Sequence, residues 1–244
     1  MIILGINSAT ARAAVAVVKN AIKKIAKTRV AGNEPATVNA RAGGKTRPYF
    51  AKSWESNRDE GEKLLPAVQL ALKALKKEKP DLIFVVRGPG SFTGLRIGVT
   101  VANMLASVLS VKVSSIDTFE YLRARVPVNL RKKTAVILKA GGEFVAVMTP
   151  RKKTSQRLNK AELAGFFRKH PTVKSAVSDM SRAEMEKIAL PKGIKWLGEK
   201  ELSGIAEVIV ELAKGLRAQK MVSPKYLLPP KITKSKKPAF TGAR

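Results

Sequence analysis

Residues 88–98 read GPGSFTGLRIG, and this glycine-rich stretch separates an apolar run, LIFVV (82–86), from a long apolar segment (93–110). The run 82–86 is typical of a buried strand, and the segment 93–110 of a helix that is buried on most of its faces. A further strand (111–116) and helix (118–125) follow, and this alternation predicts parallel strands with right-handed crossovers. The stretch therefore marks a strand-to-helix step of an α/β fold.

The glycine loop does not match the common nucleotide-binding loops. A Walker loop needs Gly, four residues, Gly-Lys and then Ser or Thr, and neither Gly88 nor Gly90 begins that pattern. The Rossmann spacing fails as well. Free NH groups at a helix N-terminus can still bind an anion, so Gly90, Ser91 and Arg96 are candidate anion-binding residues. Ser91 is also expected to cap the helix, and Arg96 equally fits an ion pair within the chain or with a partner.

Small residues line one face of the helix predicted at 93–110. Gly94, Gly98, Ala102 and Ala106 recur at every fourth position, which places them on one side. Each helical Gly costs about 0.5–1 kcal/mol relative to Ala, so this face must pack closely against something. This face could pack inside the chain. It could also pack across a subunit interface, together with an amphipathic helix predicted at 62–77, and the sequence leaves both alternatives open. The candidate interface residues are Leu64, Val68, Leu72, Gly94, Leu95, Gly98, Val101, Ala102 and Leu105.

The rest of the chain predicts two lobes and a tail. A basic, Pro-containing linker at 127–133 divides a first lobe (1–128) from a smaller second lobe (129–222), and a basic tail (223–244) follows. Asp59 and Glu62 have the spacing of a capping box. The predicted strands are 1–7, 13–19, 22–30, 82–86, 111–116, 134–140, 143–149, 173–178 and 194–197. Residues 31–54 are predicted to form a long loop with room for one short strand. The later predicted helices are 158–169, 182–188 and 200–221.

Composition excludes several kinds of chemistry. The chain has no Cys and a single His, His170, which removes disulfides, thiolate zinc sites and Cys nucleophiles and leaves no basis for His-based sites. We therefore predict no catalytic residue, no metal site and no cofactor, with weak nucleotide binding in an inter-lobe cleft as the alternative. The opening MIILGINSAT lacks the basic start of a signal peptide, and no apolar run is long enough to span a membrane. We expect a cytoplasmic protein without membrane contact.

The charge is strongly basic, with 47 Lys and Arg against 18 Asp and Glu and a formal net charge of +29. One interpretation is contact with tRNA or other RNA, because Lys and Arg release the counterions that phosphates hold. The other is a host whose proteins all carry basic surfaces. The candidate RNA contacts in the tail are Lys231, Lys234, Lys236 and Lys237.

Residues 88–98 resemble the signature of the TsaB (YeaZ) family. MIILGINSAT resembles that family's first strand and turn, Glu62–Pro66 (EKLLP) its E-x-L-L-P helix, and 224–227 (PKYL) its late P-x-Y-L. The resemblance implies a two-lobed α/β fold of the actin, Hsp70 and sugar-kinase (ASKHA) superfamily, with mixed sheets flanked by helices. It also implies a non-catalytic scaffold role in making threonylcarbamoyladenosine (t6A) in tRNA. The implied partner is a TsaD-like subunit bound through first-lobe helices, and the same surface can form a homodimer.

Departures from the family pattern bear on activity. The turn after the first strand carries Asn7, where active ATPases of the superfamily have Asp, and a neutral amide cannot replace a carboxylate toward magnesium. The stretch 138–144 (LKAGGEF) has only Glu143 as an acid, and Glu60-Gly61 stands where the family has His-Ser. No activity of its own is therefore expected. The alternative function is an RNA- or ribosome-associated basic protein that reuses the fold, and a kinase or peptidase-like enzyme is a third hypothesis.

Overall fold

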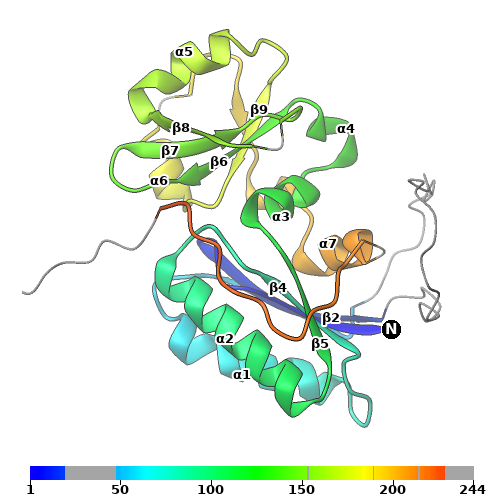
Figure 1. The fold of residues 1–244 in the computed structure, drawn as a ribbon. Helices are drawn as coiled ribbons and strands as arrows, with labels where there is room; N and C mark the ends of the chain where they lie inside the picture. Colours follow the sequence, from blue (N-terminus) through cyan, green and yellow to red (C-terminus); the bar gives the residue numbers. More distant parts are fainter. Residues whose placement is uncertain (20–47, 153, 189, 214, 229–244) are drawn as a thin grey trace, which may run out of the picture.

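The computed structural model describes residues 1–19, 48–152, 154–188, 190–213 and 215–228. Two five-stranded mixed sheets lie one above the other, each with helices against its faces (Figure 1). The predicted two-lobed α/β fold with mixed sheets is thereby confirmed. The strand predicted at 22–30, most of the loop 31–54, and the tail lysines Lys231, Lys234, Lys236 and Lys237 lie outside the described residues.

The first sheet has the order β3-β2-β1-β4-β5. β1 is central; it runs antiparallel to β2 and parallel to β4, and every one of its side chains is buried. Its alternate residues face two different cores: Ile3 faces one, and Leu4 and Ile6 face the other. Burial on both faces explains why β1, β2 and β4 read as nearly unbroken apolar runs. The strands are β1 (Ile2–Asn7), β2 (Arg12–Lys19), β3 (Phe50–Glu55), β4 (Leu82–Val86) and β5 (Lys112–Ile116).

Two helices cover the outer face of this sheet, α1 (Glu60–Ala74) and α2 (Phe92–Val108), and they lie side by side (Figure 1). Ser91 accepts a hydrogen bond from the Gly94 NH at 3.3 Å, which confirms the predicted N-cap. The capping box predicted for Asp59 and Glu62 is wrong, because Asp59 makes no side-chain cap and instead pairs with Lys63 Nζ at 2.5 Å.

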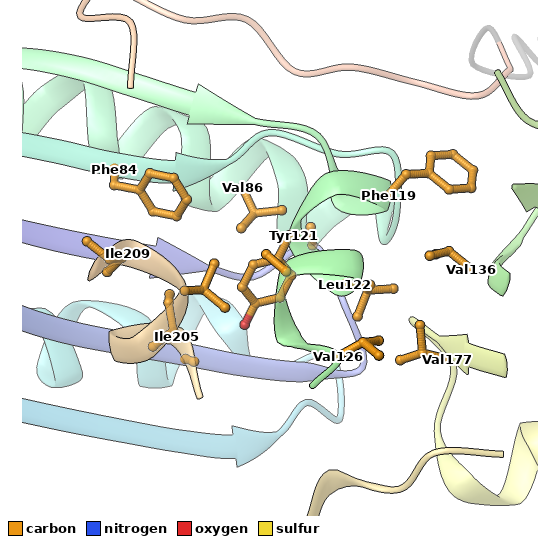
Figure 2. Close-up of a cluster of buried hydrophobic side chains, with 14 of the residues drawn as sticks. Phe84, Val86, Phe119, Tyr121, Leu122, Val126, Val136, Val177, Ile205 and Ile209 are labelled. Carbon is orange, nitrogen blue, oxygen red and sulfur yellow. The ribbon is translucent and has the colours of Figure 1, made fainter. Parts of the chain in front are cut away.

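The inner face packs against α3 (Thr118–Arg125) and α7 (Ile205–Leu212), which lie between the two sheets. Figure 2 shows the resulting core, in which Tyr121 of α3 and Ile209 of α7 lie beside Phe84 of the first sheet. Val136 and Val177 of the second sheet join the same cluster. One apolar core therefore runs from lobe to lobe.

The second sheet has the order β10-β9-β6-β7-β8. Its central strand β6 runs antiparallel to β7 on one side and parallel to β9 on the other. This repeats the topology of the first sheet, a similarity that the residues themselves do not display. The elements are α4 (Val128–Arg131), β6 (Thr134–Lys139), β7 (Phe144–Met148), β8 (Gln156–Asn159), a 3-10 turn (Lys160–Glu162), α5 (Leu163–Arg168), β9 (Ser175–Ser178), α6 (Arg182–Glu186), β10 (Lys195–Trp196) and a second 3-10 turn (Glu199–Glu201).

Two predicted helices of this lobe were wrong in extent. The segment predicted as a helix at 158–169 begins at Lys160 with a 3-10 turn that continues into α5, because Asn159 ends β8 and forms a capping box with Glu162. The helix predicted at 200–221 is reduced to Ile205–Leu212. Beyond it the chain extends, and the backbones of Gln219 and Val113 exchange hydrogen bonds of 2.7 and 2.9 Å at the edge of β5.

The last described residues, 219–228, form a C-terminal strap over the first lobe. Asn103 of α2 exchanges two hydrogen bonds with the Val222 backbone, at 2.9 and 3.1 Å, and the Lys225 NH donates to the Arg87 carbonyl at 2.7 Å. α7 likewise packs on β1 and β2. The predicted assignment of these residues to the second lobe and tail therefore differs from the structure, because β5 and α2 provide the packing surface.

Candidate functional site

The glycine face of α2 packs against the turn between β1 and β2. Ser8 Oγ donates to the Gly94 carbonyl at 2.8 Å, and the Ser91 NH donates to the Ala9 carbonyl at 2.9 Å. A side chain at Gly94 would overlap the Ser8 carbonyl, and one at Gly98 would overlap Ser8 Oγ. Of the two alternatives that the sequence left open, packing inside the chain is the correct one for this face.

Most of the predicted interface residues are consequently unavailable to a partner. Leu72 is half-buried, and the other eight are buried within the chain. As contact residues they were predicted wrongly, because helical spacing identifies a packed face but not what packs on it. The buried eight are Leu64, Val68, Gly94, Leu95, Gly98, Val101, Ala102 and Leu105.

The exposed side of the same two helices carries five large apolar side chains among polar ones. On α2, Phe92, Met104 and Val108 are 41%, 46% and 74% exposed, and on α1, Leu65 and Leu70 are 42% and 47% exposed. We call these five residues the apolar helix face. Isolated exposed apolar residues are ordinary, but several on adjacent helices are typical of a protein–protein contact.

Arg96 lies on this outer side of α2 and contacts the C-terminal strap. Its guanidinium stacks over the Phe92 ring at 3.9 Å, and its Nε donates to the Tyr226 hydroxyl at 3.1 Å. Gly90 and Ser91, by contrast, line a cleft between the lobes, whose lining does not include Arg96. The structure therefore does not bring the three predicted anion-binding residues together.

The inter-lobe cleft has a volume of about 380 Å³. Its first-lobe wall includes Glu60, which is 2% exposed and whose Oε1 accepts a hydrogen bond from Ser56 Oγ. Its second-lobe wall includes Asp179 and an ion pair between Lys139 and Glu184. Across the described part of the chain, no three acidic or His residues are arranged to hold a metal. Sequence reasoning missed Glu60 and Asp179, although Asp179 directly follows β9, where the carboxyl ends of parallel strands form sites.

Asn7 has a structural role in the turn after β1. It is fully buried, its Nδ2 donates to Thr10 Oγ1 at 2.9 Å and to the Arg12 carbonyl at 3.0 Å, and its Oδ1 accepts from the Ala9 NH at 3.1 Å. A carboxylate could not make the two donations. The amide therefore holds the turn on which α2 packs.

Asp179 joins the two lobes. Its carbonyl accepts a hydrogen bond from the Ala11 NH at 2.9 Å, and its Oδ1 accepts one from the Lys139 NH at 3.0 Å. Burial, which disfavours the charged carboxylate, raises the pKa of Asp179 to about 7. The folded chain therefore keeps a proton that the unfolded chain releases at a lower pH.

We expect this difference to make stability fall with rising pH. The pKa of Asp179 is raised from 3.8 to about 7 on folding, so the free energy of unfolding decreases across that window and levels off above it. Asp179→Asn removes the titration. The Tm of the variant minus the Tm of the unsubstituted chain should therefore increase by roughly 4–8 °C as the pH is raised from 5 to 7.5. Thermal unfolding at several pH values measures this, with Glu55→Gln at an exposed carboxylate as control. A difference independent of pH would contradict it.

Comparison with solved structures supports the fold. The chain is similar to YeaZ from Pseudomonas aeruginosa with a TM-score of 0.61 and 17% identity, over 93% of this chain and 99% of that one. Residues 54–165, from β3 into α5, match the family model described as TsaD, tRNA N6-adenosine threonylcarbamoyltransferase. Among the described residues, no helix is both long and apolar enough to cross a membrane.

Two curated relatives share sequence with the chain. A 62-residue stretch is 44% identical to the tRNA threonylcarbamoyladenosine biosynthesis protein TsaB of Bacillus subtilis (strain 168), covering 25% of this chain and 27% of that protein. These comparisons support the resemblance to the TsaB (YeaZ) family. A second TsaB, from Buchnera aphidicola subsp. Schizaphis graminum, is 27% identical over 95 residues, which are 38% of this chain and 45% of that protein. The matches thus span less than half the length of either TsaB relative.

Proposed function

We propose that the chain is a subunit of the machinery that makes t6A in tRNA, and that it binds a TsaD-like protein through the apolar helix face. Both TsaB relatives are named for this biosynthesis, and the segment that matches the TsaD family model contains α1 and α2. The observation that carries the proposal is the set of large apolar side chains exposed on these two helices. Burying them against a partner would remove apolar area from water.

The proposed role is that of a scaffold. The position where a phosphate-organising carboxylate would stand is Asn7, and all its donors and its acceptor are used within the turn. The turn therefore has no free carboxylate to organise a magnesium-bound phosphate. The chemistry of the modification is assigned to the TsaD-like partner.

A second copy of the chain is the competing occupant of the same surface. The apolar helix face is on one side of the first lobe, where two copies related by a two-fold axis could meet through it. A homodimer and the complex with the TsaD-like protein would then exclude each other. Adding the TsaD-like protein should convert homodimer into heterodimer.

Size-exclusion chromatography of the purified chain with the TsaD-like protein of the same genome tests the proposal. We expect the two to elute together, and t6A to appear in a tRNA transcript only when both are present with the remaining components of the reaction. Nucleoside analysis by mass spectrometry measures the product. No co-elution at micromolar concentration, combined with tight, steeply salt-dependent tRNA binding, would instead favour the RNA- or ribosome-associated alternative.

A further inference from the structure

A cavity of about 410 Å³ opens in the second lobe between the end of α3, α4 and the turn after β7. Four cationic side chains and one proline line it: Arg123, Arg131, Lys132, Arg151 and Pro150. Its volume falls within the roughly 300–1,000 Å³ of small-molecule sites. No acidic residue is among its lining residues, so the cavity is a concentration of positive charge.

Arg123 is held in place at this cavity. Its Nη2 donates to the Thr149 carbonyl and to the Lys152 carbonyl, both at 3.2 Å. These bonds fix the plane of the guanidinium. Its Nε is buried without a hydrogen-bond partner, and its Nη1 makes no hydrogen bond within the described parts of the chain. A cation that is already positioned loses little conformational freedom when an anion binds.

The other cations differ in how far their charge is compensated. Arg131 is neutralised by Glu211, which accepts from both its terminal nitrogens, and its Nε donates to the Val126 carbonyl at 2.7 Å. Arg131 therefore forms part of the cavity wall without adding a net positive charge. Lys132 and Arg151 are exposed, and neither has a carboxylate at ion-pair distance among the residues that the structure describes. Together with Arg123 they leave three positive charges without a counter-charge.

The surroundings of the cavity increase this charge. Residues 123–152 contain eight Lys or Arg and a single acid, Glu143, and the whole chain carries a net charge of +29. Long-range attraction of this kind concentrates polyanions at a protein surface. The lining has no aromatic side chain on which a base could stack, so the cavity is suited to phosphates rather than to bases.

We propose that this cavity binds the phosphodiester backbone of RNA without reading its sequence. Arg123 supplies a fixed cation with Nη1 left to donate to a phosphate, and Lys132 and Arg151 supply two exposed charges at the same cavity. α4 and β7, which border the cavity, lie in the second lobe, whereas α1 and α2, which carry the apolar helix face, lie on the outer side of the first (Figure 1). RNA and a protein partner could therefore be held at the same time, and the site does not depend on the proposed partner contact.

Fluorescence anisotropy of a labelled tRNA transcript with the full chain alone tests the site. At 0.1 M salt, the double variant Lys132→Gln, Arg151→Gln should bind about 10-fold more weakly, and its slope of log Kd against log salt should be lower by roughly 1.5. The matched control Lys52→Gln, Lys192→Gln removes two exposed lysines elsewhere and should change Kd by about 2-fold at most. The charge-preserving variant Lys132→Arg, Arg151→Lys should bind like the unsubstituted chain.

Three results would overturn the proposal. The first is an equal loss of affinity in the test and control variants, which would mean that the charge acts without a localised site. The second is unchanged tRNA binding with a loss of inorganic phosphate binding, which would identify a small-anion site. The third is unchanged tRNA binding with a loss of binding to vesicles containing 30 mol% phosphatidylserine, which would identify a membrane contact. Because no TsaD-like protein is present, none of these outcomes bears on the proposed partner.

Discussion

Gly94→Ala is expected to lower the free energy of unfolding by about 3 kcal/mol and the Tm by roughly 6–12 °C. The added methyl group would overlap the Ser8 carbonyl oxygen and lie 3.1 Å from Glu60 Oε1. The carbonyl belongs to a turn that Asn7 holds through three hydrogen bonds, so the turn cannot move aside without breaking them. The strain is therefore relieved only by displacing α2 from the sheet.

Gly165→Ala is the matched control, since Gly165 is also inside a helix. The nearest heavy atom to an added methyl group there is Arg168 Nη2 at 3.8 Å, so the substitution should gain about 0.5–1 kcal/mol from helix propensity. Urea or thermal unfolding followed by circular dichroism measures both variants. Equal stability of Gly94→Ala and the unsubstituted chain would show that α2 does not approach the turn this closely.

The close packing of α2 against the turn after β1 also restricts which substitutions can test partner binding. A large side chain at Gly98 would meet Ser8 Oγ inside the chain, so a loss of complex formation in such a variant would report unfolding rather than a damaged interface. Substitutions meant to disturb the partner contact must be placed on the outward side of α2.

The first lobe was largely predictable from sequence because its signals are local. The run 82–86 is buried on both faces of a sheet and is apolar throughout, and it forms β4 as predicted. The helix predicted at 118–125 is observed with the same bounds, because Asp117 caps it by accepting from the Glu120 NH at 2.9 Å and the helix ends before Pro127. Strong periodicity and clear capping residues fix such elements.

The sequence did not predict which segment of the chain packs against the glycine face of α2. Helical spacing showed that Gly94 and Gly98 share a face, but Ser8, which packs on them, is 86 residues from Gly94. The same limit applies to the inter-lobe cleft, which Glu60 and Asp179 line from different lobes. In the second lobe, the cap at Asn159 ended a strand inside a segment whose apolar spacing suited a helix. Tertiary contacts and single capping bonds decided these features.

The second large effect is expected at the apolar helix face. The double variant Met104→Glu, Val108→Glu should weaken binding of the TsaD-like protein at least 100-fold, because central apolar contacts each contribute about 2 kcal/mol or more to an interface. Both residues are exposed, at 46% and 74%, so the fold should tolerate Glu at either position. Isothermal titration calorimetry of the pair measures the change.

Val108→Glu has a close control in Val128→Glu. Val108 on α2 and Val128 on α4 are 74% and 72% exposed, so each substitution places the same charge at an equally exposed valine, in different lobes. Only Val108→Glu should weaken the complex, and the Tm of both variants should stay within about 2 °C of the unsubstituted chain. If both variants bind normally, the partner contacts another surface. If both bind weakly, the added negative charge, rather than the place where it sits, disturbs association with a chain of such high positive charge.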